Sequence, residues 1–185
     1  VEFMNPAEIR QEYGTHKQMI GGGWLKLKAG DITDDTEMSL ALGNAILNAG
    51  KVEYTSVAEA FSEWMRSKPK DIGNTVRRGI VQFRRTGQTT MPASAHDAGN
   101  GACMRCLPVA LVTLYSSWTD VQTASRLQAH TTHNNPVSDA GTECIIQMVQ
   151  AAILGEPRAE LELLAHELVM RYPVFEYRQR RRDNP

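Results

Sequence analysis

The sequence lacks the features that would place it in several specialised classes of protein. No apolar run approaches the roughly 20 residues that a membrane-spanning helix needs. No signal peptide is recognisable, so the cytoplasm is the expected location. Acidic and basic residues nearly cancel, with 20 Lys and Arg against 21 Asp and Glu. Without a basic excess, we expect neither nucleic acid nor a membrane as a partner.

Cysteine is also scarce. The three cysteines, Cys103, Cys106 and Cys144, are too few for a disulfide framework and leave one unpaired. Cys103 and Cys106 have C-x-x-C spacing, but no second pair of cysteines or histidines completes a zinc site. A thioredoxin-like redox site would need a preceding strand, which the local pattern does not offer. We interpret both as ordinary helix residues.

Alternation of β-branched residues with a period of two is almost absent, which disfavours a sheet. Helical periodicity dominates instead. With 42% hydrophobic and 22% charged residues among 185, the composition supports one packed domain. We predict an all-α fold, a compact orthogonal helical bundle. The expected helices span residues 37–48, 56–67, 75–86, 102–114, 118–129, 137–154 and 158–171.

Residues that end or begin helices support these boundaries. Gly50 and Gly87 follow two of the expected helices as C-caps. Thr55 or Ser56 is the expected N-cap of the helix over 56–67. Pro108 marks a kink or a boundary inside the stretch 102–114. The polar, glycine-rich connections are where we expect functional side chains, because loops vary in shape while helices hold them in place.

The densest group of polar side chains is Thr33-Asp34-Asp35-Thr36-Glu37, at the start of the first expected helix. Adjacent carboxylates repel each other unless a cation or a helix N-terminus neutralises them, and Mg²⁺ and Mn²⁺ prefer such oxygen ligands. Two interpretations are open. Asp34 or Asp35 caps the helix, with Glu37 in its first turn, or the group binds a divalent cation. Both hold together if one carboxylate caps and the other binds an ion.

Two further loops carry candidate residues. Gly99-Asn100-Gly101 precedes an expected helix, so its backbone N–H groups are placed to approach a diphosphate, although a plain turn explains the same residues. His133 lies in a polar loop, where histidine more often makes a structural hydrogen bond than takes part in catalysis. Asp139 begins the next expected helix and is interpreted as its N-cap.

In this order the motifs resemble those of the ADP-ribosylglycohydrolase family. The stretch Thr33 to Met38 is similar to the family's first metal motif. Four more stretches fall in family order, at residues 21–25, 71–79, 98–105 and 132–140. Together they cover about residues 1–140, and the resemblance is strongest to the glycohydrolases that activate dinitrogenase reductase.

The resemblance implies an all-helical fold, a binuclear Mg²⁺ or Mn²⁺ centre, and hydrolysis of the N-glycosidic bond between ADP-ribose and a protein arginine. In the nitrogenase-linked members, the ADP-ribosylated partner is the nitrogenase iron protein, which hydrolysis reactivates. The implied metal ligands are Thr33, Asp34 and Asp35. The implied catalytic carboxylates are Glu2 and Asp71, and their division between charge stabilisation and proton delivery is open. The implied substrate contacts, all to ADP-ribose, are Asn74, Gly99, Asn100, Gly101 and His133.

The resemblance is incomplete at both ends. The family's Gly-Asp-Ala-type stretch is not found before Glu2, and its Asp-x-Asp-Thr-type motif, which brings further metal ligands, is not found after about Arg171. We therefore expect a partial glycohydrolase core over residues 1–172, a polar basic tail over 173–185, an incomplete ligand set and exposed apolar helix faces. Two alternatives remain: a hydrolase acting on another ADP-ribosylated substrate, and an inactive ADP-ribose-binding module.

Overall fold

The computed structural model describes residues 4–15 and 17–175. The elements are α1 (Pro6–Tyr13), α2 (Asp34–Ala49), α3 (Tyr54–Arg66), α4 (Asn74–Thr86), α5 (Leu107–Val112), α6 (Trp118–Ala129), α7 (Pro136–Ile153), α8 (Arg158–Arg171) and the short 3₁₀ helix η1 (Pro173–Phe175). Within the described ranges no strand forms, and Gly22 and Leu27 make one isolated antiparallel bridge. The all-α prediction is confirmed. None of the described helices is long and apolar enough to cross a membrane.

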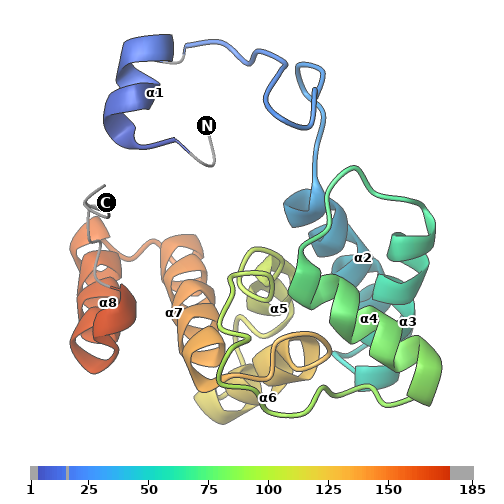
Figure 1. Ribbon diagram of the computed structural model, residues 1–185. Coiled ribbons are helices and arrows are strands. Elements are labelled where there is room, and N and C mark those ends of the chain that lie inside the picture. Colours follow the sequence, from blue (N-terminus) through green and yellow to red (C-terminus); the bar gives the residue numbers. More distant parts are fainter. Residues whose placement is uncertain (1–3, 16, 176–185) are drawn as a thin grey trace.

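The helices form two adjoining groups (Figure 1). α2, α3 and α4 pack together, and α5, α6 and α7 pack beside them, with α5 in contact with α2, α6 and α7. α8 lies along α7, at the far side from α2. α1 stands apart from the other helices, at the end of an extended segment that leads into α2 (Figure 1).

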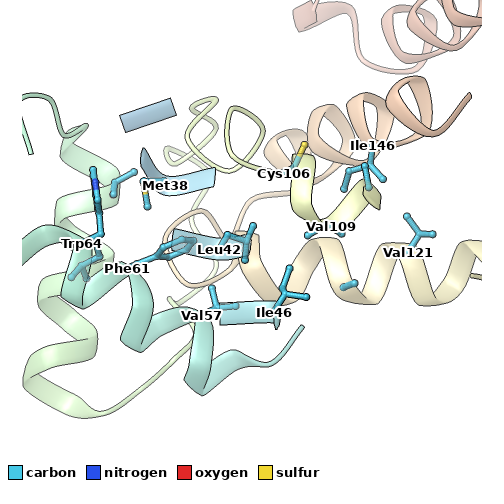
Figure 2. Close-up of a cluster of buried hydrophobic side chains, with 14 residues drawn as sticks. Met38, Leu42, Ile46, Val57, Phe61, Trp64, Cys106, Val109, Val121 and Ile146 are labelled. Atoms are coloured by element: carbon cyan, nitrogen blue, oxygen red, sulfur yellow. The ribbon is translucent and has the colours of Figure 1, made fainter. Parts of the chain in front are cut away.

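The core lies where these two groups meet (Figure 2). Residues three or four positions apart share one face of a helix, and each helix turns such a face inward. The core side chains labelled in Figure 2 are Met38, Leu42 and Ile46 from α2, Val57, Phe61 and Trp64 from α3, and Cys106, Val109, Val121 and Ile146 from the α5–α7 group. Their removal from water is the main force that holds the bundle together. Met38 is part of this core and lies four residues after the first residue of α2, so the packing also holds the start of that helix in place.

Several predicted helix boundaries are confirmed. The helices expected over 118–129 and 158–171 are α6 and α8 to the residue. Gly50 and Gly87 are the C-caps of α2 and α4, with φ angles of 70° and 73°. One N-cap prediction is wrong, because α3 begins after Glu53 rather than after Thr55 or Ser56. The Ser56 hydroxyl donates instead to Glu53 Oε2, at 3.0 Å.

The helix predicted over 102–114 is wrong in its first half. Residues 100–105 form turns, and α5 begins at Leu107. Pro108 fits only the first turn of a helix, where its missing N–H breaks no hydrogen bond. The interpretation of Cys103 as a helix residue is therefore wrong, and Cys106 is the N-cap of α5. All three cysteines are free.

Helix α1 was not predicted, although the sequence contains its signal. The Asn5 side chain accepts hydrogen bonds from the backbone N–H groups of Ala7 and Glu8 at 2.9 and 3.0 Å. Glu8 in turn accepts from the Asn5 backbone N–H at 2.8 Å, which completes a capping box, and Pro6 occupies the first turn.

Large apolar side chains are exposed along α2, α5 and the end of α7, as the sequence predicted. The group is Leu40, Leu47, Leu107, Leu111, Val112, Ile153 and Leu154. Leu47 is 80% exposed and Leu111 is 54% exposed. α5 contacts both α2 and α7, so these exposed side chains belong to neighbouring helices.

Two helix glycines differ in the space around them. A Cβ atom on Gly79 of α4 would lie 2.6 Å from Thr131 O and 2.8 Å from Thr132 Cα. On Gly43 of α2, the nearest atom would be Pro108 Cγ at 3.6 Å. Gly79 therefore lets α4 touch the backbone of the loop that carries His133.

We predict that Gly79→Ala lowers the free energy of unfolding by about 2 kcal/mol, because the backbone atoms it meets cannot move aside without strain. Gly43→Ala, the matched control, should raise it by up to about 1 kcal/mol, because alanine loses less backbone entropy in a helix. Urea unfolding followed by circular dichroism measures both. Equal effects at the two positions would show that α4 is not pressed against this loop.

Candidate functional site

Thr33, Asp34 and Asp35 meet at the first turn of α2. Thr33 occupies the N-cap position without making a capping hydrogen bond, and the two aspartates are the first two residues of the helix. The prediction that Asp34 or Asp35 caps α2 is therefore wrong. Thr33 Oγ1 instead donates to Asp35 Oδ2 at 3.4 Å. The positive end of the helix dipole favours these carboxylates here, while their oxygens are not used up by capping.

Asp71 joins this group from the loop before α4. The pKa of Asp34 is raised to about 6, first by burial and then by the negative charges of Asp71 and Asp35. Asp34 therefore lies within electrostatic range of two other carboxylates, and a divalent cation would relieve this repulsion. We call Thr33, Asp34, Asp35 and Asp71 the carboxylate group.

The donor atoms of this group suit Mg²⁺ or Mn²⁺ in kind, because hydroxyl and carboxylate oxygens are the ligands that hard cations prefer. Their number is small. In residues 4–15 and 17–175, no group of three or more His, Cys, Asp or Glu side chains is arranged to hold a metal ion. Metal binding by this chain stays a prediction.

An ion pair holds the two loops of the carboxylate group together. Lys70 Nζ donates to Asp31 Oδ2, which also accepts from the Lys28 backbone N–H at 2.8 Å. The Lys70 hydrogen bond is the larger cause of the lowered pKa of Asp31, and the Lys28 hydrogen bond follows. Asp31 precedes α2 and Lys70 adjoins Asp71, so this pair sets the position of Asp71 relative to Asp34. The sequence analysis did not single out Lys70.

Glu37 does not face the carboxylate group. Its Oε2 accepts a hydrogen bond from Trp64 Nε1 at 2.8 Å, which fastens the first turns of α2 to α3. Glu37 thus holds α2 in place rather than capping it.

His133 lies against the Gly99-Asn100-Gly101 loop. A Cβ atom on Gly101 would lie 2.6 Å from His133 Cε1, and one on Gly99 would lie 3.4 Å from Nε2. Glycine at position 101 is therefore what admits the imidazole ring. Ser138 Oγ donates to Gly99 O at 3.3 Å and holds the loop from the other side. The structure thus brings together four of the five residues predicted to contact ADP-ribose, namely Gly99, Asn100, Gly101 and His133.

The surroundings of this loop differ from the prediction in one respect. Because residues 100–105 form turns, the loop is not followed directly by a helix N-terminus. The Asn100 carbonyl accepts from the Met104 N–H at 2.9 Å within these turns. Any attraction for an anion here comes from the N–H groups of the loop and turns rather than from a helix dipole.

α4 borders both parts of the site. Asp71 and Asn74 lie at its beginning, and Asn74 is exposed. Two residues after Asn74, Val76 Cγ2 would lie 3.2 Å from a Cβ atom on Gly101. Arg78 then donates to the buried carboxylate of Asp97, which precedes the glycine loop. The carboxylate group and the glycine loop therefore flank the same end of α4.

His133 is 2% exposed. Its pKa is lowered to about 4, chiefly by burial and then by the positive charge of Arg105. The negative charge of Asp97 opposes this shift, and the positive charge of Arg78 adds to it more weakly. His133 is therefore neutral at pH 7.

Arg105 was not among the predicted site residues. Its guanidinium is fully buried, and it donates to Gln128 Oε1 at 2.8 Å, to Gln128 O at 2.9 Å and to Thr132 Oγ1 at 2.8 Å. It also lies 4.2 Å from the centre of the Phe61 ring. The available signal was an arginine inside the apolar stretch 102–114.

Glu2, predicted as a catalytic carboxylate, lies outside the described residues. Asp139 is not the N-cap of α7, because Asn135 holds that position and accepts from the N–H groups of Val137 and Ser138 at 2.8 and 3.2 Å. Asp139 instead pairs with His130 Nε2 at 3.0 Å.

The chain is similar to known proteins in sequence and in fold. The ADP-ribosylglycohydrolase family matches over residues 1–182. The chain is 47% identical over 177 residues to the ADP-ribosyl-(dinitrogen reductase) glycohydrolase of Rhodospirillum rubrum, covering 96% of this chain and 60% of the relative. It is 30% identical over 182 residues to the ADP-ribosylarginine hydrolase Tri1 of Pseudomonas putida (strain GB-1), covering 89% and 47%.

A solved structure described as an ADP-ribosylglycohydrolase-related protein complex has a TM-score of 0.70 and 28% identity to this chain. The likeness covers 80% of this chain and 49% of that one. The chain thus spans between 47% and 60% of the length of the two curated relatives above.

We predict that Asp71→Asn lowers the pKa of Asp34 from its value near 6, because the amide removes one of the negative charges that raise it. Carbon-13 NMR of the carboxyl carbons in the presence of a chelator measures this pKa, with Asp120→Asn on the exposed start of α6 as control. A raised pKa means that stability from Asp34 is present below about pH 4 and is lost as pH rises through about 6. This loss of stability should be smaller in Asp71→Asn. An unchanged Asp34 pKa would show that the charge of Asp71 does not act on Asp34.

Proposed function

Since the chain belongs to the ADP-ribosylglycohydrolase family, we propose that it forms the substrate-binding part of an enzyme that hydrolyses the N-glycosidic bond between ADP-ribose and a protein arginine. The observation that carries this proposal is the arrangement around α4. Carboxylates gather at the start of this helix, and a glycine loop with a neutral histidine packs against its first turns. These two parts match the two ends of ADP-ribosylarginine.

The proposed target is ADP-ribosylated dinitrogen reductase, the nitrogenase iron protein. What supports it is the 47% identity to a relative from Rhodospirillum rubrum that is named for that substrate. Tri1, at 30% identity, is named for ADP-ribosylarginine, the same chemical linkage. Another ADP-ribosylated protein is the alternative target within the same reaction.

In this proposal Thr33, Asp34 and Asp35 hold a Mg²⁺ or Mn²⁺ ion at the start of α2. When bound, such an ion would anchor the ribose hydroxyls and lower the pKa of a coordinated water. Asp71 acts beside it. Breaking the bond between C1″ of ribose and the arginine nitrogen builds positive charge on the ribose, and an ionised carboxylate beside that carbon stabilises it. Glu2 is the second proposed catalytic carboxylate.

The glycine loop takes the diphosphate end of ADP-ribose. Because Gly99 and Gly101 have no Cβ atoms, the loop backbone lets a ligand and the His133 ring approach closely. Asn100 is exposed and adds an amide donor. N–H groups and neutral side chains suit a diphosphate, while the carboxylates at the start of α2 and before α4 suit the cationic guanidinium of the modified arginine.

A second candidate function is an ADP-ribose-binding module that does not hydrolyse its ligand. The observation that favours it is the small donor set of the carboxylate group, which forms no closed metal site among the described residues. The diphosphate contacts at the glycine loop do not depend on a metal, so binding survives in this alternative.

We predict that the full chain releases ADP-ribose from arginine-modified dinitrogen reductase in Mn²⁺, and that a chelator stops the release. Asp34→Asn should lower the rate by about 100-fold, because a ligand of the ion is weakened. Asp120→Asn serves again as the matched carboxylate control and should keep the parent rate.

Isothermal titration with ADP-ribose separates the candidates. Binding without release of ADP-ribose from the modified protein supports the binding module. Release that is unchanged in chelator refutes the metal-dependent mechanism, and neither binding nor release refutes both candidates.

A further inference from the structure

We propose that Arg105 is a positioning residue that fixes the tautomer of His133 through Thr132, so that His133 presents Nε2–H as a hydrogen-bond donor at the Gly99–Gly101 loop. The tautomer follows from hydrogen bonds inside the protein alone. Its use, donation to an anionic oxygen of the ADP-ribose diphosphate, rests on the proposed function.

Two hydrogen bonds connect the three side chains. Arg105 Nη2 lies 2.8 Å from Thr132 Oγ1, and Thr132 Oγ1 lies 2.8 Å from His133 Nδ1. A guanidinium has donors only, so Thr132 Oγ1 must accept from Arg105. The second bond has two possible directions, and the direction decides where the imidazole carries its proton.

If His133 Nδ1–H donated to Thr132, the threonine oxygen would accept twice and its own hydroxyl proton would need another acceptor. Thr132 is fully buried, and no other partner of this hydroxyl is found in residues 4–15 and 17–175. A buried donor left without a partner costs about 1–3 kcal/mol. When the hydroxyl donates to Nδ1 instead, Arg105 Nη2, the Thr132 hydroxyl and His133 Nδ1 all have partners. The proton on Nε2 then lies at an atom that is not among the buried polar atoms without a partner. Nδ1 is then the acceptor, and the imidazole proton is on Nε2.

The surroundings also keep the ring neutral. A second proton would place an imidazolium beside the guanidinium of Arg105, away from water. Burial and the charge of Arg105 lower the pKa of His133 to about 4, and the opposing effect of Asp97 does not offset them. His133 therefore stays a neutral donor across the physiological pH range, whereas an unperturbed histidine would change its charge near pH 6.5.

Arg105 is held too firmly to release Thr132. Gln128 accepts from its Nε and Nη2 through a side-chain and a backbone oxygen, and Phe61 lies under its guanidinium. Gln128 Nε2 also donates to Ala102 O at 3.1 Å, which ties the network to the segment just after the glycine loop. No carboxylate of the described residues forms an ion pair with Arg105. Burying a cation without a counter-charge destabilises the fold, and the hydrogen bonds of Arg105, including the one to Thr132, partly offset that cost.

Nε2 of His133 points at the glycine loop. It would lie 3.0 Å from a Cβ atom on Gly101 and 3.4 Å from one on Gly99. No hydrogen-bond acceptor for it is found within the described part of the chain. Although the residue as a whole is 2% exposed, Nε2 is not among the buried polar atoms without a partner, so this atom reaches the surface at the loop. An anionic oxygen of a ligand at the loop would supply an acceptor for it.

We call the hydrogen-bonded series Arg105–Thr132–His133 the relay. Its test is nitrogen-15 NMR of histidine in the full chain at pH 7, with His133 assigned from the signal lost in His133→Gln. We expect a protonated Nε2 and an unprotonated Nδ1 in the parent. Thr132→Ser, which keeps the hydroxyl, should retain this tautomer. Thr132→Val, which has the same shape without the hydroxyl, should give a mixture with protonated Nδ1. A parent protonated on Nδ1, or a tautomer unchanged in Thr132→Val, would overturn the relay.

The test of its use is the affinity for ADP-ribose by isothermal titration, with circular dichroism to confirm that each variant is folded. We expect Thr132→Val to bind about fivefold to tenfold more weakly, the loss of about one hydrogen bond, and Thr132→Ser to bind like the parent. A shifted tautomer with unchanged affinity would refute donation to the ligand while the relay stands. A parent that does not bind ADP-ribose would refute the proposed function, and the NMR result would still decide the relay.

Discussion

The buried guanidinium of Arg105 is the interaction on which the geometry of the site depends. It reaches Met38 of α2, Phe61 of α3, Gln128 at the end of α6 and Thr132 in the loop before α7. Met38 and Phe61 belong to the apolar core seen in Figure 2. Because Arg105 itself follows the glycine loop, one side chain connects that loop, the core and the histidine loop. A hydrophobic residue would fill the same space at lower cost, but it would leave Gln128 and Thr132 without their donor.

The charges around α4 are distributed unequally, and the distribution has a chemical consequence. Burial first, and then the charges of Asp71 and Asp35, raise the pKa of Asp34 in the carboxylate group. At the glycine loop, Arg78 neutralises Asp97, and Arg105 contributes positive potential at His133. A ligand with a cationic end and an anionic end would bind in one orientation only, because reversing it would oppose like charges at both ends. ADP-ribosylarginine is such a ligand, with its guanidinium and its diphosphate.

The sequence predicted the fold where local rules decide the structure. α6 and α8 have clear helical patterns between strong stop signals, and their bounds were predicted to the residue. The prediction failed where one residue overrides the pattern, as Pro108 does by restricting α5 to Leu107–Val112. α1 was missed because its eight residues make only about two turns, too few for a periodic pattern to be read, so only its capping box marked it.

The site was predictable to the extent that its residues are neighbours in the sequence. Thr33, Asp34 and Asp35 were found as a contiguous motif, and their misassigned cap shows that a good capping residue need not cap when it lies one position inside the helix. Lys70 and Arg105 carry no such local signal. Lys70 acts through Asp31, 39 positions away, and Arg105 through Thr132, 27 positions away. Their roles exist only once packing brings distant segments together, so propensity and periodicity cannot reveal them. The residues that meet a ligand can be found from motifs, whereas the residues that orient them require the fold.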